Sequence, residues 1–145
     1  GNAVLFRADA RREGKFGIGQ RRSTGLAGSI DFAQGLLTIV RFDVPTTKER
    51  YANSQWVKVQ ANPFTGDALQ SYNAGPKDKT SGDLALVPFY EVESTSPVRN
   101  LAPGESLRHA HATYHFQGSL EKLAPIARQL LGVDLEAVKK TMLGK

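Results

Sequence analysis

FYEVESTSPVRNLAPGESLRHAHATYHF, residues 89–116, decides which fold and which chemistry to expect of this 145-residue chain. Side chains alternate between the two faces of an extended strand, so Glu91 and Glu93 share one face and lie about 7 Å apart along it. Further along, Pro103 and Gly104 stand in the order that a type II turn prefers. We therefore predict a β-hairpin over this stretch, with two carboxylates on one face of its first strand.

The three histidines of the chain all lie on the predicted return strand, Leu107 to Phe116. Alternation places His109, His111 and His115 on one face of that strand. Three explanations stay open. Two imidazoles at i, i+2 spacing can bind one divalent metal with a third ligand from elsewhere. One histidine can instead pair with a glutamate of the neighbouring strand and act as an acid, or all three can form a hydrogen-bonded polar face with a structural role.

Composition indicates one globular domain with enough apolar residues to build a core. The hydrophobic fraction is 40% and the charged fraction 23%, as in ordinary globular proteins. No apolar run reaches the roughly 18 residues that a transmembrane helix needs. The chain has no cysteine, which excludes disulfides, thiol nucleophiles and cysteine-ligated zinc but leaves cytosol and periplasm both open as compartments.

The net charge of +5 is concentrated near the two ends of the chain. A nucleic-acid site usually interleaves basic residues with stacking aromatic side chains on one surface. Only Phe6 and Phe16 flank the N-terminal basic cluster. We therefore expect a solvated basic face and no nucleic-acid partner.

The clearest strand pattern is the apolar run Gly35 to Val44, which predicts a strand buried on both faces. Clean alternation from Trp56 to Gln60 predicts a half-exposed strand, and the polar segment that follows, up to Leu84, is expected to be a long loop. Three shorter segments are interpreted from local composition as a strand, a glycine-loosened strand and a turn: Ala3–Ala8, Arg11–Gly19 and Leu26–Asp31.

After Gly118 the apolar period changes to that of a helix. Ser119 is the expected N-cap, and the apolar residues from Leu120 to Leu131 recur at helical spacing until Gly132 ends the helix. Pro125 is expected to shift the start of this helix or to kink it. A second short helix is predicted from Asp134 to about Leu143. The predicted outline is a β-rich body with a helical C-terminus.

Several motifs carry a family resemblance: Asn62-Pro-Phe-Thr-Gly-Asp67, Ser71-Tyr-Asn73, Phe89-Tyr-Glu-Val-Glu-Ser94, Leu101-Ala-Pro-Gly-Glu105 and the His-x-His-x-Thr-Tyr-His-Phe run. Together they resemble the C-terminal part of the aldose 1-epimerase (galactose mutarotase-like) superfamily, most closely an uncharacterised bacterial branch. The likeness covers most of this chain but only the last part of such a protein. It implies a mainly β fold, with residues 1–118 as part of a galactose mutarotase-like β-sandwich and residues 119–145 as a helical C-terminal appendix.

The resemblance also implies a carbohydrate partner and the interconversion of sugar anomers by acid–base catalysis, with no metal and no organic cofactor. By the family's pattern Glu93 fits the base best and Glu91 second, with His109 or His111 nearby. For substrate binding we single out Arg7 and Lys15 as donors to sugar hydroxyls or a carboxylate, Trp56 as a stacking surface and Asn73 as a residue of a loop at the rim of a cleft.

Simpler interpretations stay open for each of these residues. The two glutamates can lie on an exposed strand face, the cations on a solvated surface, Trp56 in the core and Asn73 in a turn. The alternative function is a non-catalytic carbohydrate-binding or interaction domain that lacks the acid–base pair. Because the family's acid histidine comes from the middle of a longer chain, a second copy or a preceding N-terminal portion is expected to complete the site.

Overall fold

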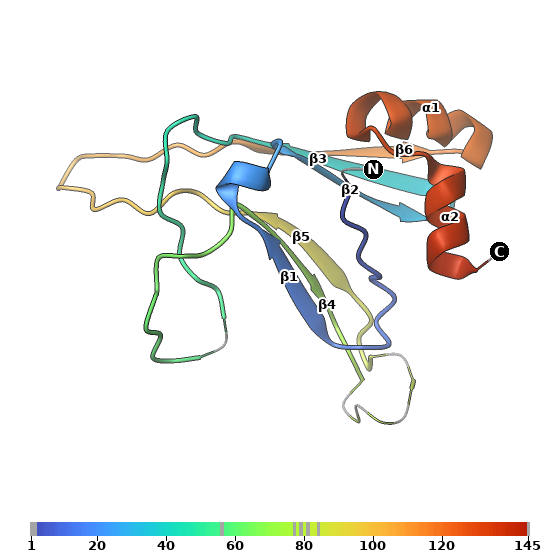
Figure 1. Ribbon diagram of the computed structural model, residues 1–145, viewed down its shortest axis with the longest axis horizontal. Helices are drawn as coiled ribbons and strands as arrows, with labels where there is room; N and C mark the ends of the chain where they lie inside the picture. The colour runs from blue at the N-terminus through green and yellow to red at the C-terminus, as the bar shows by residue number, and fades with distance from the viewer. Residues whose placement is uncertain are drawn as a thin grey trace. The chain divides into compact units, whose positions relative to one another are not determined.

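The computed structural model describes residues 3–55, 57–76, 78, 80, 82, 83 and 85–144. Within these residues six strands form two sheets of three strands, and two α-helices end the chain (Figure 1). The first sheet has the order β1-β4-β5 and the second β2-β3-β6. The prediction of a mainly β fold with a helical C-terminus is therefore confirmed. In chain order the elements are β1 (Gly14–Ile18), η1 (Gln20–Arg22), β2 (Leu26–Asp31), β3 (Leu36–Phe42), β4 (Leu69–Asn73), β5 (Tyr90–Ser94), β6 (His111–Gln117), α1 (Leu120–Leu131) and α2 (Leu135–Leu143).

The chain divides into two compact units that each draw on separate parts of the sequence. One unit contains the N-terminal residues up to Arg7, Leu26–Arg41 and the residues from Ala112 onward; the other contains Ala8–Gly25 and Phe42–His111. We call them the helical unit and the β1-β4-β5 unit. The two C-terminal helices thus belong to the same unit as most of β2, β3 and β6.

The core of the helical unit joins one strand to both helices. Leu37 and Ile39 of β3, Leu123 and Ala127 of α1 and Leu135 of α2 are all at most 2% exposed and contact one another. The apolar residues whose helical spacing predicts α1 therefore form the stripe of the helix that faces the sheet. Burial of this stripe is the main source of stability for a helix of this length, because short helices are marginal on their own.

The ends of both helices follow their sequence signals. Helix α1 begins after Ser119 and ends at Gly132, whose φ of 66° is the left-handed conformation that glycine adopts most readily. The Asp134 side chain accepts hydrogen bonds from the backbone N–H groups of Glu136 and Ala137 and so caps α2. Pro125 lies inside α1 without shifting its start from the predicted position.

The β1-β4-β5 unit has an antiparallel sheet with β4 in the centre. In its register Lys15 lies opposite Tyr72, and Tyr72 lies opposite Glu91. Strand β4 is buried along most of its length although its sequence, LQSYN, is largely polar. Its polar side chains have internal partners: Ser71 donates to the Glu91 carbonyl at 2.8 Å, and Gln70 accepts from the Ser54 hydroxyl and donates to Thr95.

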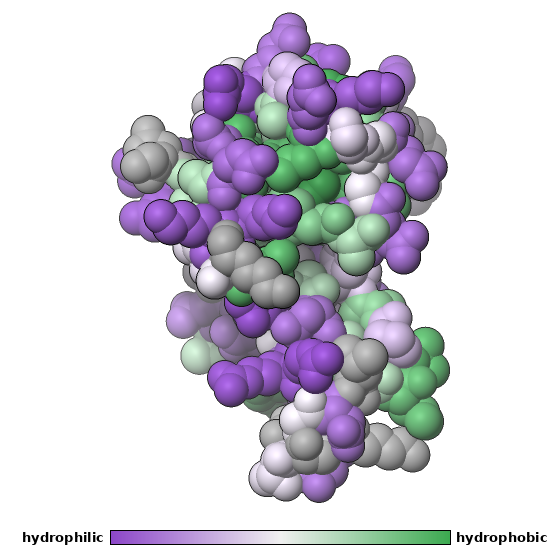
Figure 2. Space-filling model, turned by 90° about the vertical axis from the view of Figure 1, so that its right-hand side faces the viewer, coloured by the Kyte–Doolittle hydropathy of each residue, from purple (hydrophilic) through white to green (hydrophobic). Residues whose placement is uncertain are grey.

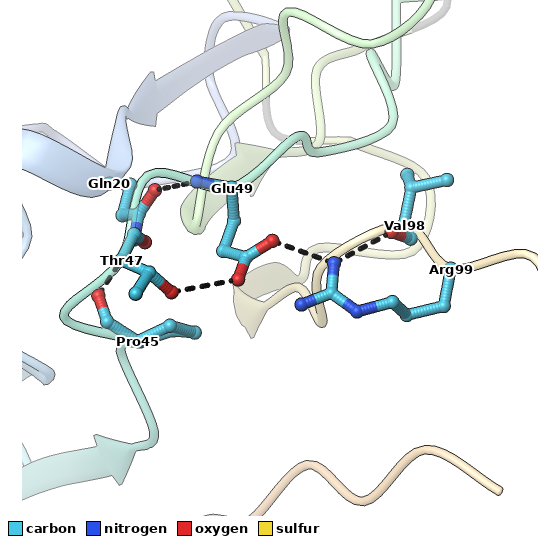
Figure 3. A network of polar contacts seen from close by, with 6 residues as sticks. All are labelled: Gln20, Pro45, Thr47, Glu49, Val98 and Arg99. Atoms are coloured by element: carbon cyan, nitrogen blue, oxygen red, sulfur yellow. Dashed lines mark hydrogen bonds and ion pairs between the residues drawn. The ribbon is translucent and has the colours of Figure 1, made fainter.

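The loops of this unit are tied down by a polar network around Glu49 (Figure 3). Arg99 donates to Glu49 Oε2 at 2.6 Å, and Thr47 donates to Oε1 of the same carboxylate at 3.0 Å. Gln20 accepts from the Glu49 N–H and donates to the carbonyls of Pro45 and Thr47. One carboxylate and one amide thus connect η1, the segment after β3 and the segment after β5.

The predicted hairpin over residues 89–116 is wrong in its pairing but right in its turn. Glu105 N–H donates to the Ala102 carbonyl at 3.0 Å, and Gly104 has a φ of 89°, as the Pro-Gly order predicts. However, β5 pairs with β4 in one sheet, whereas β6 pairs with β3 in the other. The turn is therefore a local feature of the long β5–β6 connection.

Four other predictions on strands need correction or lie outside the description. Residues 3–8 form no strand. Residues 57–60 form no strand either, with a bend at residues 58 and 59, while Trp56 is outside the described residues. Leu26–Asp31 is a strand and not a turn, because it pairs with β3 through a short connection in which Asp31 Oδ1 accepts from the N–H groups of Ala33 and Gln34. Strand β4 lies in the segment predicted as a loop. That prediction is wrong because the residues of β4 are largely polar although most of them are buried.

Figure 2 views the surface on the side of α1 and α2, where apolar side chains are visible among hydrophilic ones. Leu130 of α1 and Leu143 of α2 are among the exposed large apolar residues, at 42% and 49%. None of the helices that the structure describes is long and apolar enough to cross a bilayer.

Candidate functional site

The candidate site is one face of the β1-β4-β5 sheet. Because paired residues in neighbouring strands share a face, Lys15, Tyr72 and Glu91 form a row across the three strands. The next row on the same face consists of Gly17, Gln70 and Glu93. A cation, an aromatic ring and two carboxylates therefore come together from three strands.

The two glutamates of β5 interact with each other and with Lys15. The Lys15 ammonium lies 3.9 Å from Glu93 Oε2, reaching across β4. Partial burial raises the pKa of Glu91 above its ordinary value, and a hydrogen bond and charge repulsion from Glu93 raise it further. The positive charge of Lys15 opposes this rise. Burial and these two neighbours together therefore set the proton affinity of the Glu91 carboxyl group.

An open cavity lies over this row. Its volume is about 420 Å³, and its walls are Glu13, Lys15, Tyr72 and Glu91. The Tyr72 hydroxyl donates to Glu13 Oε1 at 3.4 Å, which links the residue before β1 to the central strand. The cavity offers hydrogen-bond acceptors, one ammonium donor and the aromatic ring of a tyrosine, a combination suited to a hydroxyl-rich ligand.

Asp67 adds a further acidic group to this face. A Cβ on Gly17 would lie 1.9 Å from Asp67 Oδ2 and 2.3 Å from its Cγ, so the Asp67 carboxyl occupies the place of a side chain at position 17. Since Gly17 and Lys15 share a face of β1, Asp67 lies on the face of the candidate site. Burial raises the pKa of Asp67.

The family model of DUF6786, described as a family of unknown function, matches residues 1–142. The chain belongs to this family. A search of the curated proteins and a search of the solved structures gave no match. The description of DUF6786 assigns no activity.

The histidines of this DUF6786 chain gather elsewhere. Ser94 Oγ lies 2.8 Å from His109 Nε2 and 2.8 Å from His111 Nδ1. Alternation along β5 places Ser94 on the face opposite Glu91 and Glu93. His115 Nδ1 lies 3.0 Å from Thr38 Oγ1 in the helical unit. The three histidines therefore form no single group on one strand face.

The metal interpretation of the histidines gains no support from the geometry. Among the residues that the structure describes, no three histidine, aspartate or glutamate side chains cluster closely enough to hold a metal ion. His109 and His111 instead share the Ser94 hydroxyl, which can donate to one imidazole and accept from the other.

The residues predicted to bind substrate lie in different parts of the structure. Lys15 lines the cavity. Arg7 is exposed in the segment before β1 and belongs to the helical unit, and Trp56 lies outside the described residues. Asn73 is 2% exposed. Its Oδ1 accepts from the Ala10 N–H at 3.0 Å and its Nδ2 donates to the Arg12 carbonyl at 2.7 Å, so it holds the segment before β1 against β4.

Three residues of the site were not singled out from the sequence as site residues: Glu13, Asp67 and Tyr72. Tyr72 and Asp67 fall in the segment that its polar composition predicts as a loop. Tyr72 lies between Ser71 and Asn73, and all three are within β4. Four of the five residues of LQSYN are buried, and three of those four are polar, so no apolar pattern in the sequence indicates this strand.

Proposed function

We propose that this chain binds a carbohydrate on the exposed face of the β1-β4-β5 sheet, and that Glu91 exchanges a proton with the bound sugar. The observation that supports this proposal is the row Lys15, Tyr72 and Glu91, which with Glu13 lines one cavity. Carboxylates accept hydrogen bonds from sugar hydroxyls, an ammonium donates them, and a tyrosine ring packs against the apolar face of a pyranose.

The chemistry proposed for Glu91 is that of a general base. Interconversion of anomers needs a group that takes the proton of the anomeric hydroxyl, and such a group works best when its pKa lies near the working pH. The pKa of Glu91 is raised by burial and by Glu93, which moves it in the useful direction. Glu91 also lines the cavity, whereas Glu93 pairs with Lys15. We therefore assign the base to Glu91 and the tuning of its pKa to Glu93.

We further propose that the two sheets are part of a galactose mutarotase-like β-sandwich, as the sequence motifs suggest. Two three-stranded sheets in the described part of the chain and the carboxylates on a sheet face are compatible with that assignment. A preceding portion or a second copy would then complete the site, because a sugar held by one sheet face still needs an acid for its ring oxygen.

A second candidate function is carbohydrate binding without catalysis. It is favoured by the position of His109 and His111, which contact Ser94 on the other face of β5 and are not among the described residues that line the cavity. A site with a base and no matching acid binds a sugar but accelerates its anomer exchange little.

One experiment separates these two functions. Two-dimensional exchange NMR on a panel of aldoses, recorded with and without protein, measures anomer interconversion, and calorimetry on the same panel measures binding. Catalysis predicts accelerated exchange that Glu91→Gln abolishes and Glu121→Gln, on exposed α1 surface, leaves intact. Binding that persists without acceleration supports the non-catalytic function. Absence of both binding and acceleration for every sugar contradicts the proposal.

A further inference from the structure

A second cavity adjoins the candidate site. It has a volume of about 400 Å³ and shares two walls, Glu13 and Tyr72, with the first cavity. Its other walls are small or apolar: Ala74, Gly75, Pro76, Ala85, Leu86, Val87 and Phe89. The two cavities are therefore neighbours separated by the Glu13–Tyr72 pair, one polar and one largely apolar.

Three of the large apolar side chains that line this second cavity are exposed to solvent. Leu86 is 78% exposed, Val87 69% and Phe89 45%. Phe89 packs beside Tyr72 with their ring centroids 5.6 Å apart and their planes inclined by 52°. A run of consecutive exposed apolar residues is unusual on a monomer surface and commonly marks a binding site.

Tyr72 lines both cavities and makes one polar and one aromatic contact. Its hydroxyl donates to Glu13, and its ring packs against Phe89. A ligand that spans both cavities would therefore contact Tyr72. The hydroxyl of Tyr72 suits a polar part of such a ligand, and its ring suits an apolar part. Each cavity alone falls in the range of about 300–1,000 Å³ that is typical of small-molecule sites.

We infer that the ligand is amphipathic: a sugar that carries an apolar aromatic or alkyl substituent. This inference rests on the carbohydrate binding in the proposed function and adds the substituent to it. Glycosides are suitable probes of this binding because they have no anomeric hydroxyl and so bind without anomer exchange. The sugar occupies the cavity of Lys15 and Glu91, and the substituent covers Leu86, Val87 and Phe89. An apolar group fits there because contact between three apolar side chains and water is unfavourable, and their burial against an apolar group is favourable.

The test compares glycosides that differ only in the aglycone. Calorimetry with methyl and phenyl β-glycosides of glucose and galactose measures binding to the wild type, to Leu86→Ser/Val87→Ser and to the control Val59→Ser, whose side chain is 87% exposed and lies outside the cavity. All these positions are at the surface, so the fold should survive the substitutions. Circular dichroism of each variant verifies that it does.

We expect the phenyl glycoside of at least one sugar to bind about tenfold more tightly than its methyl counterpart, a gain that burial of one ring on the apolar wall can supply. The double variant should lose this preference while its affinity for the methyl glycoside stays unchanged, and Val59→Ser should keep it. Equal binding of methyl and phenyl glycosides overturns the inference but leaves the proposed carbohydrate function intact. Failure of all glycosides and free sugars to bind overturns both.

Discussion

The Lys15 ammonium and the Glu93 carboxylate lie 3.9 Å apart on a face of the β1-β4-β5 sheet that also carries Glu91. Both side chains are partly exposed, so the pair itself adds at most about 1 kcal/mol to stability. Its importance is electrostatic, because Glu91 experiences a carboxylate that raises its pKa and an ammonium that lowers it. The pKa of Glu91 therefore depends on where the Lys15 and Glu93 side chains lie on this face.

Substitution of Lys15 and substitution of Glu93 should move the pKa of Glu91 in opposite directions. Lys15→Met removes the positive charge and should raise that pKa, whereas Glu93→Gln removes the repulsion and should lower it. Side-chain ¹³C NMR of the carboxyl groups across a pH titration measures both shifts. Lys58→Met, on the exposed loop after β3, serves as the control. An unchanged Glu91 titration in both variants would mean that the three side chains do not share a face in solution.

Neutralisation of Glu91 should stabilise the fold, with a defined pH dependence. Because burial, and secondly Glu93, raise the pKa of Glu91 in the folded state above its ordinary value, the folded state favours the protonated form more than the unfolded state does. The contribution of Glu91 to stability is then fully present below the unfolded-state pKa and is lost as pH rises through the folded-state pKa. We expect Glu91→Gln to be more stable than the wild type at neutral pH and to lose this advantage in acid. Urea denaturation at both pH values measures the difference, and a destabilised variant at neutral pH would contradict the assignment.

The Glu49 network should respond to acid in the opposite sense. Hydrogen bonds from Arg99, and secondly from Thr47, lower the pKa of Glu49. A carboxyl group with a lowered pKa stabilises the fold above its unfolded-state value and loses that contribution as pH falls through the folded-state pKa. Arg99→Ala should therefore destabilise the protein at neutral pH and much less in acid, as measured by urea denaturation. Arg108→Ala, which alters an exposed arginine on the β5–β6 connection, should show no such dependence.

The position of α1 on its sheet depends on Gly28. A Cβ at this position would lie 2.6 Å from Leu131 Cδ1 and 2.9 Å from the Thr38 carbonyl oxygen. Gly28→Val should therefore force the helix away from β2 and cost about 1–3 kcal/mol of unfolding free energy, the usual range for overpacking. Gly118→Ala is the control, because a Cβ there meets its nearest atom at 3.5 Å. Thermal unfolding of the two variants should separate them, and equal melting temperatures would show that α1 does not pack on Gly28.

Local features of this fold could be predicted from sequence, and non-local pairing could not. The helix from Leu120 to Leu131, its end at Gly132 and the Pro103-Gly104 turn all depend on residues within a few positions of one another. The partner of β5, in contrast, is β4, a strand whose residues are hydrogen-bonded polar groups and not an apolar run. Hydrophobic periodicity does not detect such a strand, whereas the Pro103-Gly104 turn predicts that the strand after it is the partner of β5.

The same limit explains which part of the site could be predicted. Glu91 and Glu93 share a face because of alternation along one strand, and the sequence alone indicates this. The grouping of Lys15 and Tyr72 with them depends on the β1-β4-β5 register, which required the structure. His109 and His111 were expected beside the glutamates because β6 was expected to pair with β5. They meet at Ser94, one residue beyond Glu93 and on the other face of the strand.

The central claim is that a sugar binds on the face formed by Lys15, Tyr72 and Glu91. Titration of ¹⁵N- and ¹³C-labelled protein with the aldose panel, followed by NMR, tests this claim most directly, because each side chain reports its own position. We predict saturable shifts for Lys15 Nζ, the Tyr72 ring and the Glu91 carboxyl, with the Ser94 and His109 signals unperturbed. Shifts confined to Ser94, His109 and His111, or no saturable shift with any sugar, would contradict it.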